Sequence, residues 1–132
     1  MSLDNGNTNP GYRIGRLFAV LEKIQEEASP GINATIRDRY YSSASGTPAS
    51  VFPILLRMKN HHIGKLPSRG REIYFEKLLG DVVSEVAANG FPAQLSLADQ
   101  GRFAIGYYHQ RQAFFTTSDK SESKDADKGE GI

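Results

Sequence analysis

The sequence predicts an all-α protein, a compact bundle of about five helices followed by a disordered C-terminal tail. Apolar residues recur at intervals of three and four over several long segments, which is the period of an amphipathic helix. None of these segments alternates polar and apolar residues as a half-buried strand does. With 132 residues, 39% of them hydrophobic, the chain can build one core but not two. We therefore expect a helical bundle domain over residues 1–117 and a charged tail over residues 118–132.

The first predicted helix begins at Pro10, with Asn9 as its N-cap, and stops at residues 29–31, where serine, proline and glycine follow one another. Its stripe consists of Ile14, Leu17, Phe18, Leu21, Ile24 and Ala28. A short second helix is predicted from Asn33, as the cap, to about Tyr41. Its apolar stripe is thin, so we expect this helix to be partly exposed.

Small residues at 42–47 predict a loop, after which a third helix starts. Pro53 is tolerated only near a helix start, which favours Ser50 as the cap. One face of this helix is marked by Val51, Leu55, Met58 and His62.

Residues 66–70 form a predicted turn before the fourth helix, which ends at Asn89-Gly90. This helix has the clearest stripe: Phe75, Leu78, Leu79, Val82 and Val86. Ser96 to Asp99 resembles a capping box and predicts a fifth helix running through Phe115. Glycines 80, 101 and 106 fall inside these helices, where each costs about 1 kcal/mol relative to alanine, so we expect close helix packing there. Residues 119–132 hold one large apolar residue and predict disorder.

Several classes of protein are excluded by what the sequence lacks. It has no apolar run as long as the roughly 18 residues of a membrane span, and its polar N-terminus does not resemble a signal peptide, so we expect a cytoplasmic protein. With no cysteine there can be no disulfide, thiolate zinc site or thiol nucleophile. Neither a dinucleotide-binding motif, a phosphate loop nor a serine nucleophile elbow occurs, and we expect no cofactor.

A catalytic or metal site has weak candidates. His61 and His62 are adjacent and therefore lie about 100° apart on a helix, unlike a metal-binding pair at i and i+4, and His109 is distant in sequence. Acidic pairs such as Glu26-Glu27 are typical of solvated helix faces. We expect no enzymatic activity. Metal-dependent DNA cleavage lost on replacing His61 or His62 would indicate otherwise.

The charge is distributed unevenly, although the net charge is only +1. From Arg37 to Arg71 seven basic residues stand against Asp38 alone, a net +6, whereas the segment after Thr117 has three lysines and five acids. Basic clusters with interspersed tyrosines, at residues 12–16 and 37–41, could contact phosphates and stack on unpaired bases. Two alternatives stay open: surface ion pairs with Glu22, Glu26 and Asp38, and the rim of a protein contact.

Three long strings resemble a known family: NTNPGYRIGRLFAVLEKIQ at residues 7–25, GINATIRDRYY at 31–41 with the SASGTP and VFP that follow, and LSLADQGRFAIGYYHQRQ at 95–112. They are similar to the small subunit of the type I-C CRISPR Cascade effector, and equally to the C-terminal region of its large subunit. The resemblance covers about residues 3 to 116. The Met1 start fits a separately translated small subunit and fits an artificial fragment equally well.

The resemblance implies a non-catalytic helical subunit. Its expected partners are the Cascade backbone subunits, the large subunit, other copies of itself, the guide RNA complex and target DNA in the R-loop. Because guide pairing reads the target, such a subunit needs only sequence-independent DNA affinity. The alternative is a purely architectural subunit without direct nucleic-acid contact. Candidate nucleic-acid-binding residues within the matching strings are Arg13, Arg16, Arg37, Arg39, Tyr40 and Arg111; Arg57 and Lys59 are added by the charge count.

Overall fold

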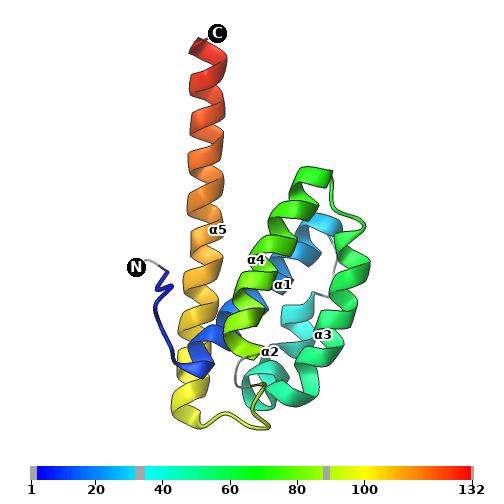
Figure 1. Cartoon of the computed structure of the whole chain (residues 1–132), viewed down its shortest axis with the longest axis vertical. Coiled ribbons are helices and arrows are strands. Elements are labelled where there is room, and N and C mark those ends of the chain that lie inside the picture. Colours follow the sequence, from blue (N-terminus) through cyan, green and yellow to red (C-terminus); the bar gives the residue numbers. More distant parts are fainter. Residues whose placement is uncertain (1–2, 32–34, 88–89, 132) are drawn as a thin grey trace.

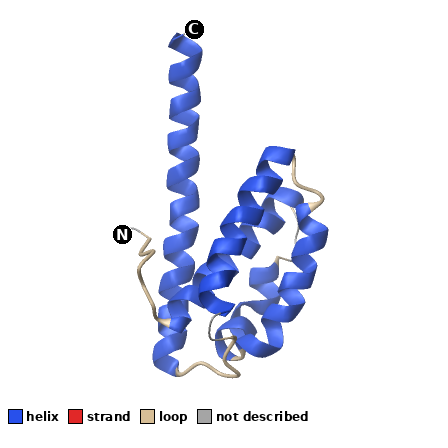
Figure 2. Ribbon diagram, viewed as in Figure 1, coloured by secondary structure: helices blue, strands red, loops and turns tan. Residues whose placement is uncertain are grey.

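The structure, a computed structural model, describes residues 3–31, 35–87 and 90–131, with side chains except those of Ala87 and residues 117–131. Every regular element in these ranges is an α-helix (Figure 2). The five are α1 (Pro10–Ala28), α2 (Ile36–Gly46), α3 (Pro48–Ile63), α4 (Arg69–Ala87) and α5 (Leu97–Gly131). The predicted all-α bundle is therefore confirmed. Within the described ranges, none of these helices has the length and apolarity needed to cross a membrane.

Helix α1 is the centre of the bundle. It contacts each of the other four helices, and 13 of its 19 residues are buried (Figure 1). Its start is as predicted: the Asn9 side chain accepts from the Tyr12 backbone N–H, and Pro10 occupies the first turn. A helix with partners on almost every side must be apolar around most of its circumference. This explains why most residues of α1 between Ile14 and Ile24 are apolar and buried.

Helices α1 and α5 run parallel and approach closely, because three glycines lie where their backbones touch. A Cβ added to Gly11 or Gly15 would collide with the carbonyl oxygen of Asp99 or Phe103, respectively. A Cβ on Gly106 would collide with the carbonyl oxygen of Tyr12. Close packing was predicted for Gly106 and is confirmed. For Gly80 and Gly101 the prediction is wrong, since no atom lies within 4 Å of a Cβ built at either position.

The parallel pair brings two helix N-termini together around Asp99. The Asp99 backbone N–H donates to Ser96 Oγ at 3.1 Å, as the predicted capping box requires. The Asp99 carboxylate accepts from Asn9 Nδ2 at 3.1 Å and from Arg102 Nη1 at 3.3 Å. One carboxylate thus lies at the positive ends of both helix dipoles, where a negative charge is stabilising.

Helix α2 differs from the prediction at both ends. It begins after Thr35, which forms a complete capping box with Asp38, while the predicted cap Asn33 lies outside the described residues. It continues to Gly46, so the predicted end near Tyr41 is wrong and most of the predicted loop over 42–47 is helical. The small residues are there because this turn of helix is tightly packed: Ala44 is 0% and Ser45 8% exposed.

Helix α3 begins at Pro48, without an intervening loop, and not after the predicted cap Ser50. Pro53 is consequently inside the helix, where its missing N–H leaves the Ala49 carbonyl without its usual helical donor. The junction is held by the segment before α5: the Ala49 N–H donates to the Pro92 carbonyl at 3.1 Å, and the Leu95 N–H donates to the Gly46 carbonyl at 3.1 Å. These long-range bonds explain a boundary that local sequence does not predict.

Helix α4 matches its predicted stripe, and α5 begins as predicted, directly after Ser96. Phe75, Leu79, Val82 and Val86 are buried, and Leu78 is half-buried. The predicted stop at Asn89 lies outside the described residues, and α4 ends at Ala87. Helix α5 extends past the other helices as far as Gly131 (Figure 1). No other helix lies beside its last turns, and an isolated helix of about 15 residues is marginal in water, so the predicted disorder of this tail is consistent with the fold.

Candidate nucleic-acid interface

The eight predicted binding residues lie on four helices, and seven of them fall into three groups. Arg13 and Arg16 are on the side of α1 that faces α4. Arg37 and Arg111 lie where α2 meets α5, and Arg39, Arg57 and Lys59 are on the surface of α2 and α3. Tyr40 is half-buried and packs against the core. The sequence therefore selected residues that the fold does not bring to one site.

Arg16 is an interior residue, with 5% of its surface exposed. Its Nε donates to Gln110 Oε1 at 3.0 Å, and its Nη1 lies 3.5 Å from Glu85 Oε2. A guanidinium enclosed in this way joins α1, α4 and α5 and does not present its charge to a polyanion.

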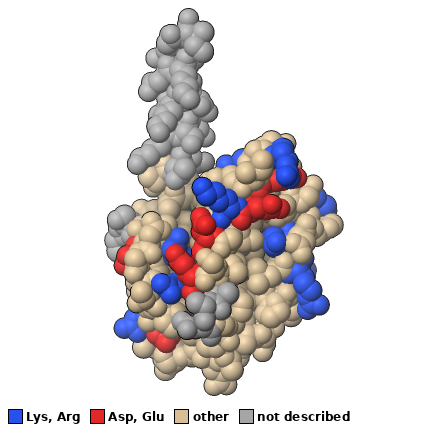
Figure 3. Space-filling model, in the orientation of Figure 1, with Lys and Arg blue, Asp and Glu red and all other residues tan. Residues whose placement is uncertain are grey.

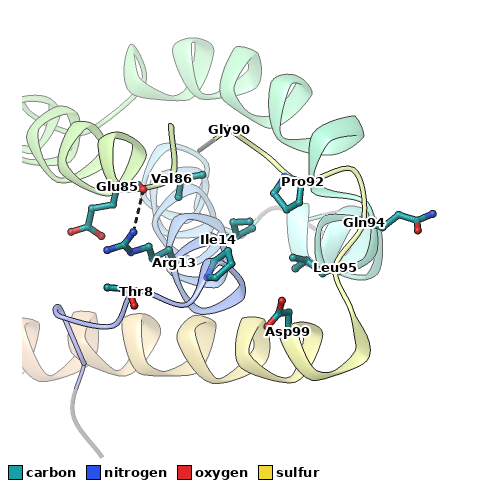
Figure 4. Close-up of a pocket in the computed structure, with 11 residues that line it drawn as sticks. Thr8, Arg13, Ile14, Glu85, Val86, Gly90, Pro92, Gln94, Leu95 and Asp99 are labelled. Atoms are coloured by element: carbon teal, nitrogen blue, oxygen red, sulfur yellow. Dashed lines mark hydrogen bonds between the residues drawn. The ribbon is translucent and has the colours of Figure 1, made fainter. Parts of the chain in front are cut away.

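Arg13 lines a cavity of about 380 Å³ between the start of α1, the end of α4 and the segment before α5 (Figure 4). Its Nε donates to the Asn7 carbonyl at 3.0 Å and its Nη1 to the Glu85 carbonyl at 3.4 Å. The cavity wall is mainly apolar, with Ile14, Val86 and Leu95 among its residues. Two of the nitrogens of Arg13 are thus engaged in holding the chain entering α1 against α4.

The surface group on α2 and α3 carries positive charge that nearby acids do not neutralise. Arg39 and Arg57 are exposed and Lys59 is half-buried, and within the described residues none has a carboxylate within 4.0 Å of its charged nitrogens. The same holds for Lys65, just after α3. Helix α3 contains no acidic residue. In Figure 3, Lys and Arg follow the right-hand edge, where Figure 1 places α3, and the acidic side chains lie nearer the centre.

Two of the seven basic residues counted between positions 37 and 71 are paired with acids that lie outside the counted segment. Arg71 forms a two-point contact with Glu27 of α1, at 2.9 and 2.6 Å, and Arg69 pairs with Glu72 at 2.8 Å. The net +6 counted along the chain therefore overstates the local charge. The alternative ion pairs with Glu22, Glu26 and Asp38 are not formed by any of the eight residues, among those the structure describes.

Arg37 and Arg111 lie beside aromatic rings of α5. The Nη2 of Arg37 donates to the Tyr108 hydroxyl at 3.1 Å, and its guanidinium carbon is 5.6 Å from the Tyr107 ring centroid and 6.0 Å from that of Tyr108. The guanidinium carbon of Arg111 is 5.8 Å from the Phe115 centroid. Both distances are in the range of a cation–π contact.

The aromatic rings available for stacking differ from those that the sequence indicated. Tyr12 is buried, and Tyr41 packs against Phe18, whereas Tyr108 is 50% and Phe115 53% exposed. The sequence predicted only that Tyr108 and Phe115 lie on a helix, with no binding role. Their spacing carried a signal nonetheless, because seven residues return to nearly the same helix face, and that face lies roughly 100° around the helix from the buried Phe103 and Tyr107.

Beneath this surface lies a buried carboxylate. Glu22 is 5% exposed, and the Tyr107 hydroxyl lies 2.7 Å from its Oε1 and 2.8 Å from its Oε2 and donates to the carboxylate. Burial raises the pKa of Glu22 above its ordinary value, an effect that the Tyr107 hydrogen bond and the nearby Arg111 and Arg37 charges counteract only in part. Burial also raises the pKa of the Tyr107 hydroxyl, which the Glu22 carboxylate raises further.

The raised pKa of Glu22 predicts a pH dependence of stability. The stabilisation that Glu22 contributes to the folded state is fully present below the ordinary carboxyl pKa of 4.5. It is lost as the pH rises through the folded-state pKa. Glu22→Gln removes this titration. The free energy of unfolding of the variant, minus that of the wild type, should therefore increase from pH 4 to pH 7. Urea unfolding at several pH values measures the difference. Glu26→Gln, which removes an exposed charge from the same helix, is the control; a Glu22→Gln difference independent of pH would contradict the prediction.

The histidines do not assemble into a site. His61 and His62 have ring centroids 6.0 Å apart, and burial lowers the pKa of His62, assisted by His61 and Lys65. His109 Nδ1 hydrogen bonds with the Tyr12 hydroxyl at 2.8 Å, on another side of the bundle. Within the described residues no three histidine, aspartate or glutamate side chains are placed to hold a metal ion.

A family model matches most of the chain. The model of a family described as CRISPR-associated protein (Cas_Csd1) matches residues 1–115. No curated protein matches the chain. The matched segment includes the four packed helices and the part of α5 that contacts them.

Proposed function

Because the chain belongs to the CRISPR-associated Cas_Csd1 family, we propose that it is a non-catalytic small subunit of a type I-C RNA-guided complex. In this role it binds DNA strands of the R-loop through their backbone and stabilises both the R-loop and the assembly. Sequence discrimination is left to guide pairing, so the subunit needs cations that reach phosphates and no reader of base edges.

The observation that carries the proposal is the unpaired positive edge of α2 and α3. Arg39 and Arg57 are exposed on neighbouring helices, with Lys59 and Lys65 on and after α3. The sequence from residue 39 to 71 contains no acid. An edge that carries only positive charges attracts a polyanion. Binding there releases the counterions that had condensed on the nucleic acid. Arg16 is left out of this role because its guanidinium is buried.

A salt series tests the proposal. The complex is reconstituted with its guide and either the wild-type chain or Arg39→Ala/Arg57→Ala, and target-DNA affinity is measured as the salt concentration rises. Each phosphate contact contributes about 0.9 to the slope of log affinity against log salt. Loss of both contacts should therefore flatten the slope by about two units and weaken binding most at low salt.

Arg69→Ala/Arg102→Ala is the matched control, since it removes the same charge from exposed arginines that already pair with Glu72 and Asp99. Its slope should stay close to that of the wild type. If the two double variants behave alike, the effect is one of net charge and the proposed edge is wrong. If Arg39→Ala/Arg57→Ala instead releases the subunit from the complex without DNA, on gel filtration, these arginines contact protein and the architectural alternative is favoured.

A further inference from the structure

Helix α5 has a second apolar face that the bundle does not cover. One face packs on α1 through Phe103, Tyr107 and Phe114. A second face, centred roughly 120° around the helix from the first, carries a row that we call the outer stripe, whose large members are Leu97 (85% exposed), Ile105 (50%), Tyr108 (50%) and Phe115 (53%). An amphipathic helix in a monomeric bundle needs only one such face, so the outer stripe indicates a binding surface.

Cations from three helices surround the two rings of the outer stripe. Arg37 of α2 lies beside Tyr108, and Arg111 of α5 lies beside Phe115. Lys23 of α1 places its Nζ 5.9 Å from the Phe115 centroid. Because each ring is about half exposed, a part of each remains accessible beside its cation.

The charges around the outer stripe favour a polyanion over an ordinary protein partner. Residues 100–116 of α5 contain two arginines, one histidine and no acid. The nearest carboxylates are already engaged: Glu22 is buried and accepts from Tyr107, and Glu26 lies 3.9 Å from Lys23. Arg37 and Arg111 have no carboxylate within 4.0 Å among the described residues.

The start of α4 provides a contrast within the same molecule. Ile73 and Tyr74 are exposed there, and Arg71 stacks on Tyr74 with its guanidinium carbon 4.9 Å from the ring centroid. Here, however, the Glu27 carboxylate accepts from Nε and Nη2 of Arg71, and Glu72 pairs with Arg69. An aromatic patch with neutralised cations suits a protein contact, whereas Arg37 and Arg111 beside the outer stripe have no carboxylate partner among the described residues.

We propose that the outer stripe binds single-stranded nucleic acid by stacking unpaired bases on Tyr108 and Phe115. The two rings are seven residues apart, about 10 Å along the helix, so they engage two separate bases of one strand. Lys23, Arg37 and Arg111 contact the phosphates between and beside those bases. The inference deepens the proposed function, on which it rests, by assigning an unpaired strand to α5, on a surface separate from the α2–α3 edge.

An abasic ligand separates stacking from backbone attraction. The full 132-residue chain is titrated, by fluorescence anisotropy, into a labelled oligothymidylate and into an abasic oligonucleotide of the same length and charge. The wild type should bind the base-bearing strand more tightly. Tyr108→Ala and Phe115→Leu should each reduce this preference about tenfold and leave the salt slope unchanged. Tyr108→Phe keeps the ring and should retain most of the preference.

The possible outcomes assign the failure to one proposal or the other. Equal, salt-dependent binding to both strands would overturn stacking and leave the phosphate-binding function standing. A base preference that survives Tyr108→Ala and Phe115→Leu would also overturn the assignment to these rings. If the base preference is found but Arg39→Ala/Arg57→Ala leaves the salt slope unchanged, the α2–α3 edge fails and the outer stripe stands. If the ring variants dissociate from the assembled complex even when no DNA is present, the outer stripe is a protein contact.

Discussion

Phe18→Ala is expected to lower the free energy of unfolding by about 4 kcal/mol, the largest effect of any single substitution considered for this chain. Phe18 is fully buried on α1. Its ring centroid lies 5.6 Å from that of Tyr41, 6.4 Å from Phe52, 5.9 Å from Phe103 and 5.8 Å from Tyr107. Truncation leaves a cavity among side chains of α2, α3 and α5 at once. Denaturant unfolding monitored by circular dichroism measures the loss.

Phe115→Ala is the matched control for this substitution. It removes the same side chain from the outer face of α5, where 53% of Phe115 is exposed. Its effect on stability should stay below about 1 kcal/mol. Because a domain of this kind is stable by roughly 5–15 kcal/mol, Phe18→Ala should remove a large share of its stability. Equal losses for the two variants would show that the Phe18 aromatic cluster is not the centre of the core.

Gly15→Ala should destabilise the bundle by about 3 kcal/mol, the upper end of the range for overpacking. The added methyl group would collide with the Phe103 carbonyl oxygen and would lie 2.9 Å from the Tyr107 backbone nitrogen. Both neighbours are backbone atoms of a helix, so neither can move without displacing α5 as a whole. Thermal and urea unfolding measure the loss.

Gly101→Ala distinguishes this steric effect from helix propensity. Both glycines are helical, but no atom lies within 4 Å of a Cβ at position 101. Alanine there should stabilise the protein by about 0.5–1 kcal/mol, since it restricts the unfolded chain and favours helix. Opposite signs for the two substitutions are therefore expected. A Gly15→Ala variant as stable as the wild type would mean that α1 and α5 are farther apart than described.

The parts of the fold that the sequence predicted are those governed by local periodicity. Helices α1 and α4 carry long apolar stripes, and both of their ends lie within a few residues of the predicted positions. For α5 the start was predicted correctly, whereas its end at Gly131 lies well beyond the predicted end near Phe115. The boundary between α2 and α3 was missed because it depends on Pro92 and Leu95, which hydrogen bond to it from far along the chain. Serine and glycine at 42–46 have low helix propensity, and tertiary packing overrides it.

The candidate site was less predictable, since charge counted along a chain cannot include acids from other helices. Arg71 is an example: the sequence places it in a strongly basic segment, and the fold places it on Glu27. Nor does the sequence show that Arg16 is buried. This residue lies one helical turn from Tyr12, in a pattern typical of a nucleic-acid contact. Tyr108 was overlooked because its role depends on which face of α5 the bundle covers, and that follows only from the contact with α1.

The glycine contact between the first and last helices also has a consequence for the order of folding. Gly15 and Phe103, which meet there, are separated by 88 positions, so this close backbone contact joins segments that are far apart along the chain. At a synthesis rate of about 5–20 residues per second, α1 is made roughly 5 to 15 seconds before its main partner. During that interval the apolar surface of α1 has only α2, α3 and α4 to cover it. The last helix therefore closes the core, and the high sequence separation of this contact should slow that step.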